Sequence, residues 1–500
     1  RYFRDVKGVE VLTRHKAIKI DRAARMVHCE DLESVRETAF PYDRLVIATG
    51  SEPIPPTIPG VVRTGSSGDP SNATFFTTPD DAIKLRRELE TGKIGRVAII
   101  GAGFIGLELC EAFAAMWGVD VDLFELQPHV LSDVLDIESS RLVEDELSRQ
   151  GINLHLGCRC QEIITEGNKV SVFDSSSEMV ETDRIIFAGG MRPNTELATD
   201  AGLEIGVTGG IKVDKRLTTS DPDIFAAGDC VELQGASHVG LWLLGSLAVR
   251  MGRIAGDNIC HGDSHFAPVA GSSILKVFDL TVGFGGMTEI QGREEGYDVG
   301  GSWGTFHDRM NYYPDSVPLH ARLVYDLAKG TVLGFQAVSR GVLIHILDKA
   351  TQIIRRGETL EELYELENAY APPYAQPFDP LHFLAFIAEN SRSAGVKLVS
   401  PAEYDRLSDD TLIIDVRSPH EIEGLSLDAG GRPKMEIPVE ELRSRLDEIP
   451  AGIPVVTACM MGGRAWDAAI MLRRSGWNDV GILAGGVLFQ PDPTLKKQEG

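Results

Sequence analysis

The stretch at 96–117 constrains the fold more than any other part of this 500-residue chain. An apolar run at 96–100 leads into the glycine pattern Gly101-x-Gly103-x-x-Gly106, and a helical pattern follows. Gly101 allows a tight turn, Gly103 leaves room for a pyrophosphate beside the backbone, and Gly106 lets the helix pack closely on the strand. The order of strand, glycine loop and helix therefore predicts a dinucleotide-binding βαβ unit.

A second strand pattern at 119–124 completes this unit and ends at Glu125. A carboxylate about twenty residues beyond the glycine loop can accept a hydrogen bond from a ribose 2′-hydroxyl. The same charge repels a 2′-phosphate, so the sequence favours NADH over NADPH. The residues expected to contact this cofactor are Gly101, Gly103, Phe104, Ile105, Gly106, Glu108 and Glu125.

Two further apolar runs, at 42–50 and 219–230, each end in a tight glycine turn. Together they resemble the Ala-Thr-Gly and Gly-Asp motifs of two-dinucleotide flavoprotein disulfide reductases, and 188–194 and 247–253 extend the resemblance. It implies that Asp229 hydrogen-bonds the ribityl chain of FAD, although a solvated turn acid is the alternative for this residue taken alone. The resemblance adds as cofactor contacts Ala48, Thr49, Gly50, Gly190, Gly228, Asp229 and Ala248.

Near the C-terminus, Cys459 lies between a buried strand pattern at 453–458 and a helical pattern at 465–472. Backbone N–H groups and the helix dipole favour an anion at such a position, so the sequence predicts a reactive thiolate. A buried structural cysteine is the alternative for this residue taken alone.

The loop from Cys459 to Arg464 resembles the active loop of rhodanese sulfurtransferases, and the surrounding segments at 412–417 and 485–486 resemble their first strand and closing Gly-Gly turn. The resemblance implies that the cysteine carries a sulfane sulfur held by loop N–H groups and the arginine. Methionines stand where loops built for thiosulfate often carry extra positive charge, which favours a less charged persulfide or polysulfide.

Between these regions, strand patterns at 273–278 and 321–325 and a helical pattern at 342–354 fit an α+β dimerisation domain. The segments 310–314 and 369–374 resemble the Tyr-Tyr-Pro and Ala-Tyr-Ala-Pro-Pro motifs of coenzyme A (CoA) disulfide reductases and related NADH oxidases and persulfide reductases.

This resemblance implies that Tyr312 (or Tyr313) and Tyr370 reach a thiol site in the partner subunit, where a phenol can hydrogen-bond a thiolate. Simple packing at the subunit interface is the alternative. The predicted catalytic residues are therefore Cys459, Arg464, Tyr312 and Tyr370.

Together the patterns predict an α/β chain with Rossmann-like FAD and NAD domains, an α+β dimerisation domain and a C-terminal rhodanese α/β domain. The expected boundaries are 1–90 and 213–264 for the FAD-binding domain, 91–212 for the NAD(H)-binding domain, 265–388 for the dimerisation domain and 396–490 for the rhodanese-like domain. We expect a short helix and a linker at 377–393. No strand–glycine-loop–helix precedes Tyr42, so we also expect an upstream segment that holds this FAD loop and the family's redox cysteine.

Composition narrows the function classes. The formal net charge of -25 argues against nucleic acid or an anionic membrane as a partner. No apolar run approaches the roughly twenty residues that span a bilayer. The seven cysteines are too few for a disulfide framework, and no second Cys/His pair lies near Cys158 and Cys160, so no metal site is expected. These features favour a cytoplasmic protein, and the resemblances described above imply a homodimer that acts on a small thiol, persulfide or disulfide.

The resemblances imply NADH- and FAD-dependent reduction of sulfur–sulfur bonds in CoA disulfide, CoA persulfide or polysulfide. In this interpretation Cys459 exchanges sulfane sulfur with the reductase centre. Two alternatives stay open at this point: an NADH oxidase or peroxidase of the same family, and a sulfurtransferase whose flavin half is vestigial.

Overall fold

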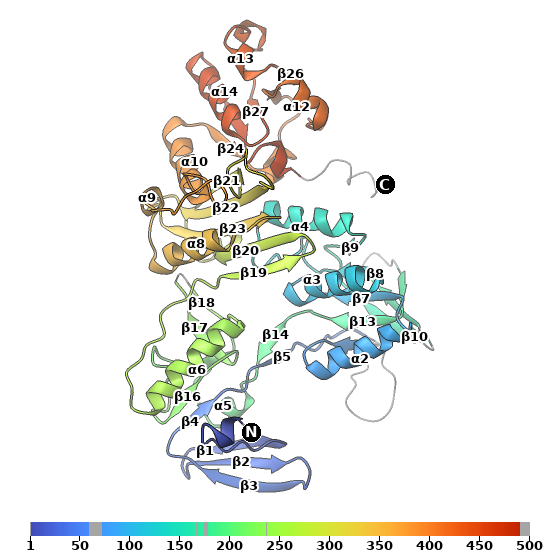
Figure 1. Cartoon of the computed structure of the whole chain (residues 1–500), viewed down its shortest axis with the longest axis vertical. Coiled ribbons are helices and arrows are strands. Elements are labelled where there is room, and N and C mark those ends of the chain that lie inside the picture. The colour runs from blue at the N-terminus through green and yellow to red at the C-terminus, as the bar shows by residue number, and fades with distance from the viewer. Residues whose placement is uncertain (1, 60–72, 167–168, 175–178, 237, 491–500) are drawn as a thin grey trace. The chain divides into compact units, whose positions relative to one another are not determined.

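The computed structural model describes residues 2–59, 73–166, 169–174, 179–236 and 238–490 (Figure 1). Within these ranges, no helix has the length and apolar character needed to cross a membrane. The same residues contain no group of three or more His, Cys, Asp or Glu side chains that could hold a metal ion.

The chain divides into two compact units, each built from segments far apart in the sequence. Unit 1 comprises Arg1–Ile54 and Gly190–Val269, and unit 2 comprises Pro55–Gly189 and Ala270–Gly500.

Unit 1 contains small sheets packed around one apolar core. Its strands are β1 (His15–Asp21), β2 (Met26–Asp31), β3 (Arg36–Pro41), β4 (Leu45–Ile47), β5 (Ser51–Pro53), β14 (Met191–Pro193), β15 (Ile211–Lys212), β16 (Ile224–Ala226), β17 (Val231–Gln234) and β18 (Val239–Gly240). Its helices are α1 (Tyr2–Asp5), α5 (Glu196–Asp200) and α6 (Gly245–Ile259). The parallel pair β4 and β16 joins the two apolar runs that end in glycine turns, and the Ala227 N–H donates to the Ile47 carbonyl at 3.0 Å.

The first sheet of unit 2 is parallel, with the order β6-β13-β7-β8-β9. Its elements are β6 (Ala73–Phe75), α2 (Pro79–Glu90), β7 (Arg96–Ile100), α3 (Phe104–Glu111), β8 (Asp120–Phe124), α4 (Ile137–Arg149), β9 (Asn153–His155) and β13 (Arg184–Phe187), with an antiparallel sheet of β10 (Glu162–Glu166), β11 (Lys169–Phe173) and β12 (Met179–Thr182). The predicted βαβ unit is confirmed. A π-helical stretch, Ala112–Met116, continues α3.

The structure draws two boundaries earlier in the chain than the sequence analysis expected. β6 pairs with β13, and Leu85 of α2 packs in the core of this sheet, so 73–90 lies with the parallel sheet of unit 2, although the sequence analysis grouped residues up to 90 with 213–264. Conversely, β14 pairs with β5, and the segment from Gly190 to Val269 belongs to unit 1. Strand pairing with distant residues decides both boundaries, and such short strands carry little periodicity of their own.

The second large sheet of unit 2 is antiparallel, with the order β19-β20-β23-β22-β21. Its elements are β19 (Ser273–Val277), β20 (Leu280–Gly286), α7 (Glu289–Glu294), β21 (Val299–His307), β22 (Pro318–Asp326), β23 (Val332–Ser339), α8 (Ile344–Arg356), α9 (Leu360–Tyr364) and α10 (Pro380–Ala394). The expectation of a short helix and linker at 377–393 was wrong: α10 is a full helix, because Leu381, Leu384 and Ala388 bury its apolar face in the core.

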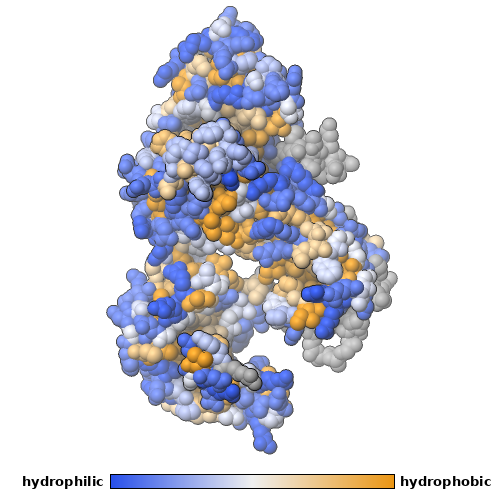
Figure 2. Space-filling view, viewed as in Figure 1, coloured by the Kyte–Doolittle hydropathy of each residue, from blue (hydrophilic) through white to orange (hydrophobic). Residues whose placement is uncertain are grey.

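The last sheet is parallel, with the order β24-β28-β27-β25-β26. Its elements are β24 (Lys397–Val399), α11 (Pro401–Tyr404), β25 (Leu412–Asp415), α12 (Pro419–Gly424), β26 (Lys434–Glu436), α13 (Val439–Leu442), β27 (Val455–Ala458), α14 (Gly463–Arg474) and β28 (Val480–Leu483). The central strands are buried along their whole length, as their continuous apolar runs require. Hydrophilic residues cover much of the visible surface of this C-terminal part (Figure 2).

This C-terminal sheet rests on the dimerisation part of unit 2. Trp303 of β21 packs with Ala484 and Phe489. The Thr305 hydroxyl donates to the Gly485 carbonyl at 2.7 Å and lies 3.1 Å from His320 Nδ1. Because burial lowers the pKa of His320 to about 4, this histidine is neutral and its Nδ1–H donates to the threonine. The Gly-Gly turn is therefore held by a hydrogen-bond chain that runs from Gly485 through buried Thr305 to the partly buried His320.

Candidate active site

Cys459 sits between the end of β27 and the start of α14, with 2% of its surface exposed. Its Sγ accepts the backbone N–H of Gly462 at 3.1 Å and that of Ala465 at 3.4 Å. Gly462 has a φ of 104°, which a residue with a side chain rarely adopts, and this turn aims the N–H groups at the sulfur. The N-terminus of α14 adds its partial positive charge, so the local backbone stabilises an anionic sulfur.

The Gly485-Gly486 turn after β28 packs against the backbone of the loop that carries Cys459. Gly486 has a φ of 72°, and a Cβ there would lie 2.4 Å from the Met460 carbonyl oxygen. The N–H of Val487 donates to the Cys459 carbonyl at 2.9 Å, and that of Leu488 donates to the Met460 carbonyl at 3.1 Å. These contacts fix the loop backbone, so the thiol and its N–H donors are preorganised.

Arg464 does not donate to the sulfur. Its guanidinium donates two hydrogen bonds, at 2.6 and 2.8 Å, to the carboxylate of Glu421 on α12. This pairing lowers the pKa of Glu421 to about 2. The sequence analysis missed Glu421, although the Ser418-x-x-Glu421 capping box that starts α12 is visible in the sequence.

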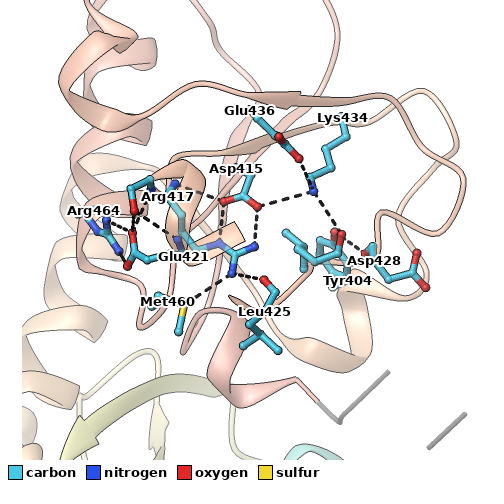
Figure 3. A network of polar contacts seen from close by, with 12 residues as sticks. Tyr404, Asp415, Arg417, Glu421, Leu425, Asp428, Lys434, Glu436, Met460 and Arg464 are labelled. Carbon is cyan, nitrogen blue, oxygen red and sulfur yellow. Dashed lines mark hydrogen bonds and ion pairs between the residues drawn. The ribbon is translucent and has the colours of Figure 1, made fainter. Parts of the chain in front are cut away.

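A buried ion pair lies behind the loop (Figure 3). Arg417 donates to both carboxylate oxygens of Asp415, at 2.9 and 2.7 Å, and neither side chain is exposed. Its Nη1 also donates to the Leu425 carbonyl at 2.7 Å and lies 3.6 Å from the Met460 sulfur. The pair thus joins the end of β25 to the loop that carries the cysteine.

The glycine loop after β7 fits a dinucleotide. A Cβ on Gly101 would lie 2.4 Å from the Ala188 carbonyl oxygen, and a Cβ on Gly106 would lie 2.0 Å from the Gly101 carbonyl oxygen. A Cβ on Gly103 would meet no described atom within 4 Å. Gly101 and Gly106 therefore allow the backbone to pack closely, whereas Gly103 faces the open space that a pyrophosphate needs.

Glu125 follows β8 directly and turns back towards this loop. Its carboxylate accepts the N–H of Ala102 at 2.7 Å and that of Gln127 at 2.8 Å. Ile105 and Glu108 line a surface pocket of about 550 Å³ between α2 and α3. The loop, the acid and this pocket all belong to unit 2, but neither the three glycines nor Glu125 lines the pocket.

In unit 1, the predicted FAD residues gather at the ends of β4 and β16. A Cβ on Gly228 would lie 3.8 Å from the Ala248 Cβ, so the Gly-Asp turn contacts the start of α6. Ser51 Oγ donates to Asp229 Oδ2 at 3.3 Å, but the buried Oδ1 has no hydrogen-bond partner among the described residues. A buried carboxylate oxygen without a donor is costly, and a ribityl hydroxyl would satisfy it.

Two hydrogen bonds between Thr49 and Asn194 hold the turns that follow β4 and β14 against each other. Thr49 Oγ1 donates to the Asn194 carbonyl at 2.6 Å, and the Asn194 side chain donates to the Thr49 carbonyl at 3.0 Å. Gly50 and Gly190 have φ values of 69° and 106°. These left-handed conformations explain why glycine stands at both turns.

The two tyrosine motifs also meet in the structure. The N–H of Met310 donates to the Pro372 carbonyl at 3.4 Å. Tyr312 is 68% exposed and Tyr370 is 44% exposed. The two segments are joined by this backbone hydrogen bond, and each exposed tyrosine side chain is available to a partner subunit rather than packed in the core of its own chain.

These features define a chain that joins a dinucleotide-binding reductase to a thiol-bearing domain. Residues 3–252 match the family described as pyridine nucleotide-disulphide oxidoreductase, 272–381 match the dimerisation domain of that family, and 400–488 match a rhodanese-like domain. The chain therefore belongs to the pyridine nucleotide-disulphide oxidoreductase family and is an oxidoreductase. The family is FAD-dependent and uses NAD(P)H.

Individual relatives share much of the chain. The NAD(P)H coenzyme A polysulfide/persulfide reductase of Pyrococcus horikoshii is 32% identical, over 76% of this chain and 82% of the relative. An NADH oxidase of Methanocaldococcus jannaschii is 31% identical, over 76% of this chain and 82% of the relative. The structure of a NAD-dependent persulfide reductase from A. fulgidus has a TM-score of 0.90 and 34% identity, over 98% of this chain and 88% of that chain. The last similarity extends through the rhodanese-like domain.

Proposed function

We propose that this protein is a cytoplasmic, homodimeric enzyme that uses NADH and FAD to reduce the sulfur–sulfur bonds of persulfides and polysulfides, including those carried on CoA. The observation that carries the proposal is the Cys459 thiol cradle, which lies in the same compact unit as the glycine loop at Gly101–Gly106. Similarity to a persulfide reductase over nearly the whole chain supports it. The oxidase alternative does not account for a preorganised thiol.

At Cys459, the thiolate attacks the outer sulfur of a persulfide R–S–SH. A new S–S bond forms on the cysteine, the S–S bond of the donor breaks, and its electron pair leaves on R–S⁻. The N–H groups of Gly462 and Ala465 stabilise the negative charge on Sγ before attack. The product, Cys–S–SH, stores one sulfane sulfur for reduction or transfer.

The reductase half needs two dinucleotides, which supply a hydride and relay its electron pair. We assign NADH to the glycine loop and Glu125, and FAD to the turns at Gly50 and Gly228 with Asp229. Overall, reduction of R–S–SH consumes one NADH and one proton and releases R–SH and H₂S. Unit 1 would thus hold FAD, and the parallel sheet that contains β7 would hold NADH.

The dimerisation domain supports a homodimer. In this assembly, exposed Tyr312 and Tyr370 would reach the thiol site of the partner subunit, where their hydroxyl groups can hydrogen-bond a thiolate. The cytoplasmic assignment follows from the small number of cysteines, and the acidic net charge supports a small-molecule substrate rather than nucleic acid.

The test is anaerobic NADH oxidation with CoA persulfide, with H₂S measured in parallel. We expect equal amounts of NADH consumed and H₂S released, and little turnover when oxygen is the only acceptor. Turnover with oxygen but not with persulfide would instead support an NADH oxidase.

The Cys459→Ser variant should lose sulfur transfer to cyanide and keep NADH-dependent flavin reduction, because the two sites are separate. Cys260→Ser, at an exposed cysteine of unit 1, is the matched control and should keep both activities. Loss of both activities in Cys459→Ser would contradict the two-site scheme.

A further inference from the structure

The only ionisable side chains in the segment from Cys459 to Arg464 are the cysteine itself and the arginine. Both Arg464 hydrogen bonds to a side chain go to Glu421. The hydrogen bonds to Glu421 chiefly raise the pKa of Arg464, and the charge of Cys459 adds a smaller increase. The N–H of the next residue, Ala465, donates to the Cys459 sulfur at 3.4 Å. Glu421 therefore compensates the one cation that could attract an anionic donor.

The surrounding network adds no spare positive charge. Arg417 is paired with buried Asp415, and Lys434 lies 3.0 Å from Glu436. In Figure 3 each labelled cation faces a carboxylate. Among the described residues of this network, the three cations Arg417, Lys434 and Arg464 are each paired with a carboxylate, so sulfur held in the loop meets backbone N–H dipoles rather than a free cation from this network.

We propose that Glu421 is a specificity-determining residue that makes the Cys459 loop favour donors with little charge beside the transferred sulfur, such as organic persulfides, over compact dianions such as thiosulfate. The inference rests on the proposed sulfur transfer at Cys459. Backbone dipoles stabilise one developing thiolate, but a dianion that enters a low-dielectric loop loses hydration over two charges. With Arg464 neutralised, nothing in the described loop offsets the second charge.

The chemistry is the same for both donors. With thiosulfate, the Cys459 thiolate attacks the sulfane sulfur, the S–S bond breaks, and sulfite leaves with the electron pair. With an organic persulfide, R–S⁻ leaves instead. Cyanide then removes the sulfane sulfur as thiocyanate and restores the thiolate. The donors therefore differ in charge rather than in the bonds formed and broken.

The Glu421→Gln variant tests the proposal. Glutamine at this third helical position keeps the Ser418 capping box and removes the charge. Glu403→Gln is the matched control, because Glu403 forms the equivalent capping box with Ser400 on α11. Thiocyanate formation is measured with thiosulfate and with an organic persulfide.

We expect Glu421→Gln to raise the ratio of kcat/KM for thiosulfate over persulfide by about fivefold to tenfold, chiefly through the KM for thiosulfate. The gain should shrink as salt is raised to about 0.5 M, because salt screens the freed arginine. The double variant Glu421→Gln/Arg464→Gln should lose this rise in the thiosulfate-over-persulfide ratio, and Glu403→Gln should keep the ratio of the unmodified protein. An unchanged ratio in Glu421→Gln would overturn the proposal.

A second measurement does not depend on sulfur transfer. Iodoacetate and iodoacetamide are similar in size but differ in charge, and alkylation of the Cys459 peptide can be followed by mass spectrometry. Glu421→Gln should raise the iodoacetate-to-iodoacetamide rate ratio. If this ratio rises while no variant transfers sulfur, the proposed function fails and the charge inference stands; if it does not rise, the charge inference fails.

Discussion

Replacing Gly103 by alanine adds one methyl group at a place where the structure leaves open space. The residue has a φ of -84°, and the new Cβ would meet no described atom within 4 Å. Gly103 is the N-cap of α3, where alanine is poorer than glycine, so the free energy of unfolding should fall by no more than about 1 kcal/mol. The fold therefore tolerates the change.

The affinity for NADH should fall much more than the free energy of unfolding does. The methyl group occupies the space through which a pyrophosphate approaches the backbone. Weakening one charge-assisted hydrogen bond to a phosphate costs about 1.5–3 kcal/mol, which corresponds to a rise of roughly tenfold to a hundredfold in the Kd for NADH. This loss should occur in a protein that unfolds almost as the unmodified one does.

Gly106→Ala provides the contrast. Its Cβ would lie 2.0 Å from the Gly101 carbonyl oxygen and 3.1 Å from the carbon, so α3 must move away from β7. Overpacking of this kind costs about 1–3 kcal/mol, and it distorts the same loop. Gly106→Ala should therefore lose both stability and NADH affinity.

The assay pairs fluorescence titration with NADH and urea unfolding followed by circular dichroism. Gly256→Ala, at an exposed position within α6 with no described atom within 4 Å of its new Cβ, controls for the substitution itself and should stabilise by up to about 1 kcal/mol. Wild-type NADH affinity in Gly103→Ala would refute the assignment of this loop to the pyrophosphate.

Three further predictions concern single side chains. Glu125→Ala should bring the kcat/KM ratio of NADH over NADPH closer to one, since the carboxylate no longer repels a 2′-phosphate; an unchanged ratio would remove Glu125 from the site. Arg417→Met removes the close, two-point partner of the fully buried Asp415 and leaves it the more distant Lys434, at 3.8 Å, so it should destabilise the C-terminal domain by up to about 3–5 kcal/mol in urea unfolding. A loss below about 1 kcal/mol would contradict the buried-pair account. Because Arg464 lowers the pKa of Glu421 from 4.5 to about 2, the pair contributes stability above pH 4.5 and loses it as the pH falls towards 2. Acid unfolding of Glu421→Gln should lack this component, and identical acid profiles would show that the pair contributes no stability.

Much of the site could be predicted because its signals are local. The glycine loop, its strands and Glu125 occupy one continuous stretch, and the structure places them together. Cys459 lies between a buried strand and a helix, as its flanking patterns indicate. In such cases neighbouring residues determine the conformation, so short-range rules suffice.

The contacts that set the charge of the thiol loop were not predictable in this way. Glu421 and Arg464 are 43 positions apart, and Thr305 and Gly485 are 180 apart. The sequence analysis expected Arg464 to hold the sulfur, and this role stays a prediction. In the structure the guanidinium donates its side-chain hydrogen bonds to Glu421. No local pattern identifies which distant carboxylate a surface arginine meets.

The sequence by itself determined the kinds of elements, the glycine-dependent turns and the position of the thiol at a helix N-terminus, because these follow from backbone conformation and periodicity over a few residues. Only the tertiary structure decided which sheet takes β6 and β14, and which carboxylate neutralises Arg464. Those outcomes depend on which surfaces pack together, since strand pairing and ion pairs form between groups that the chain brings together only when it folds.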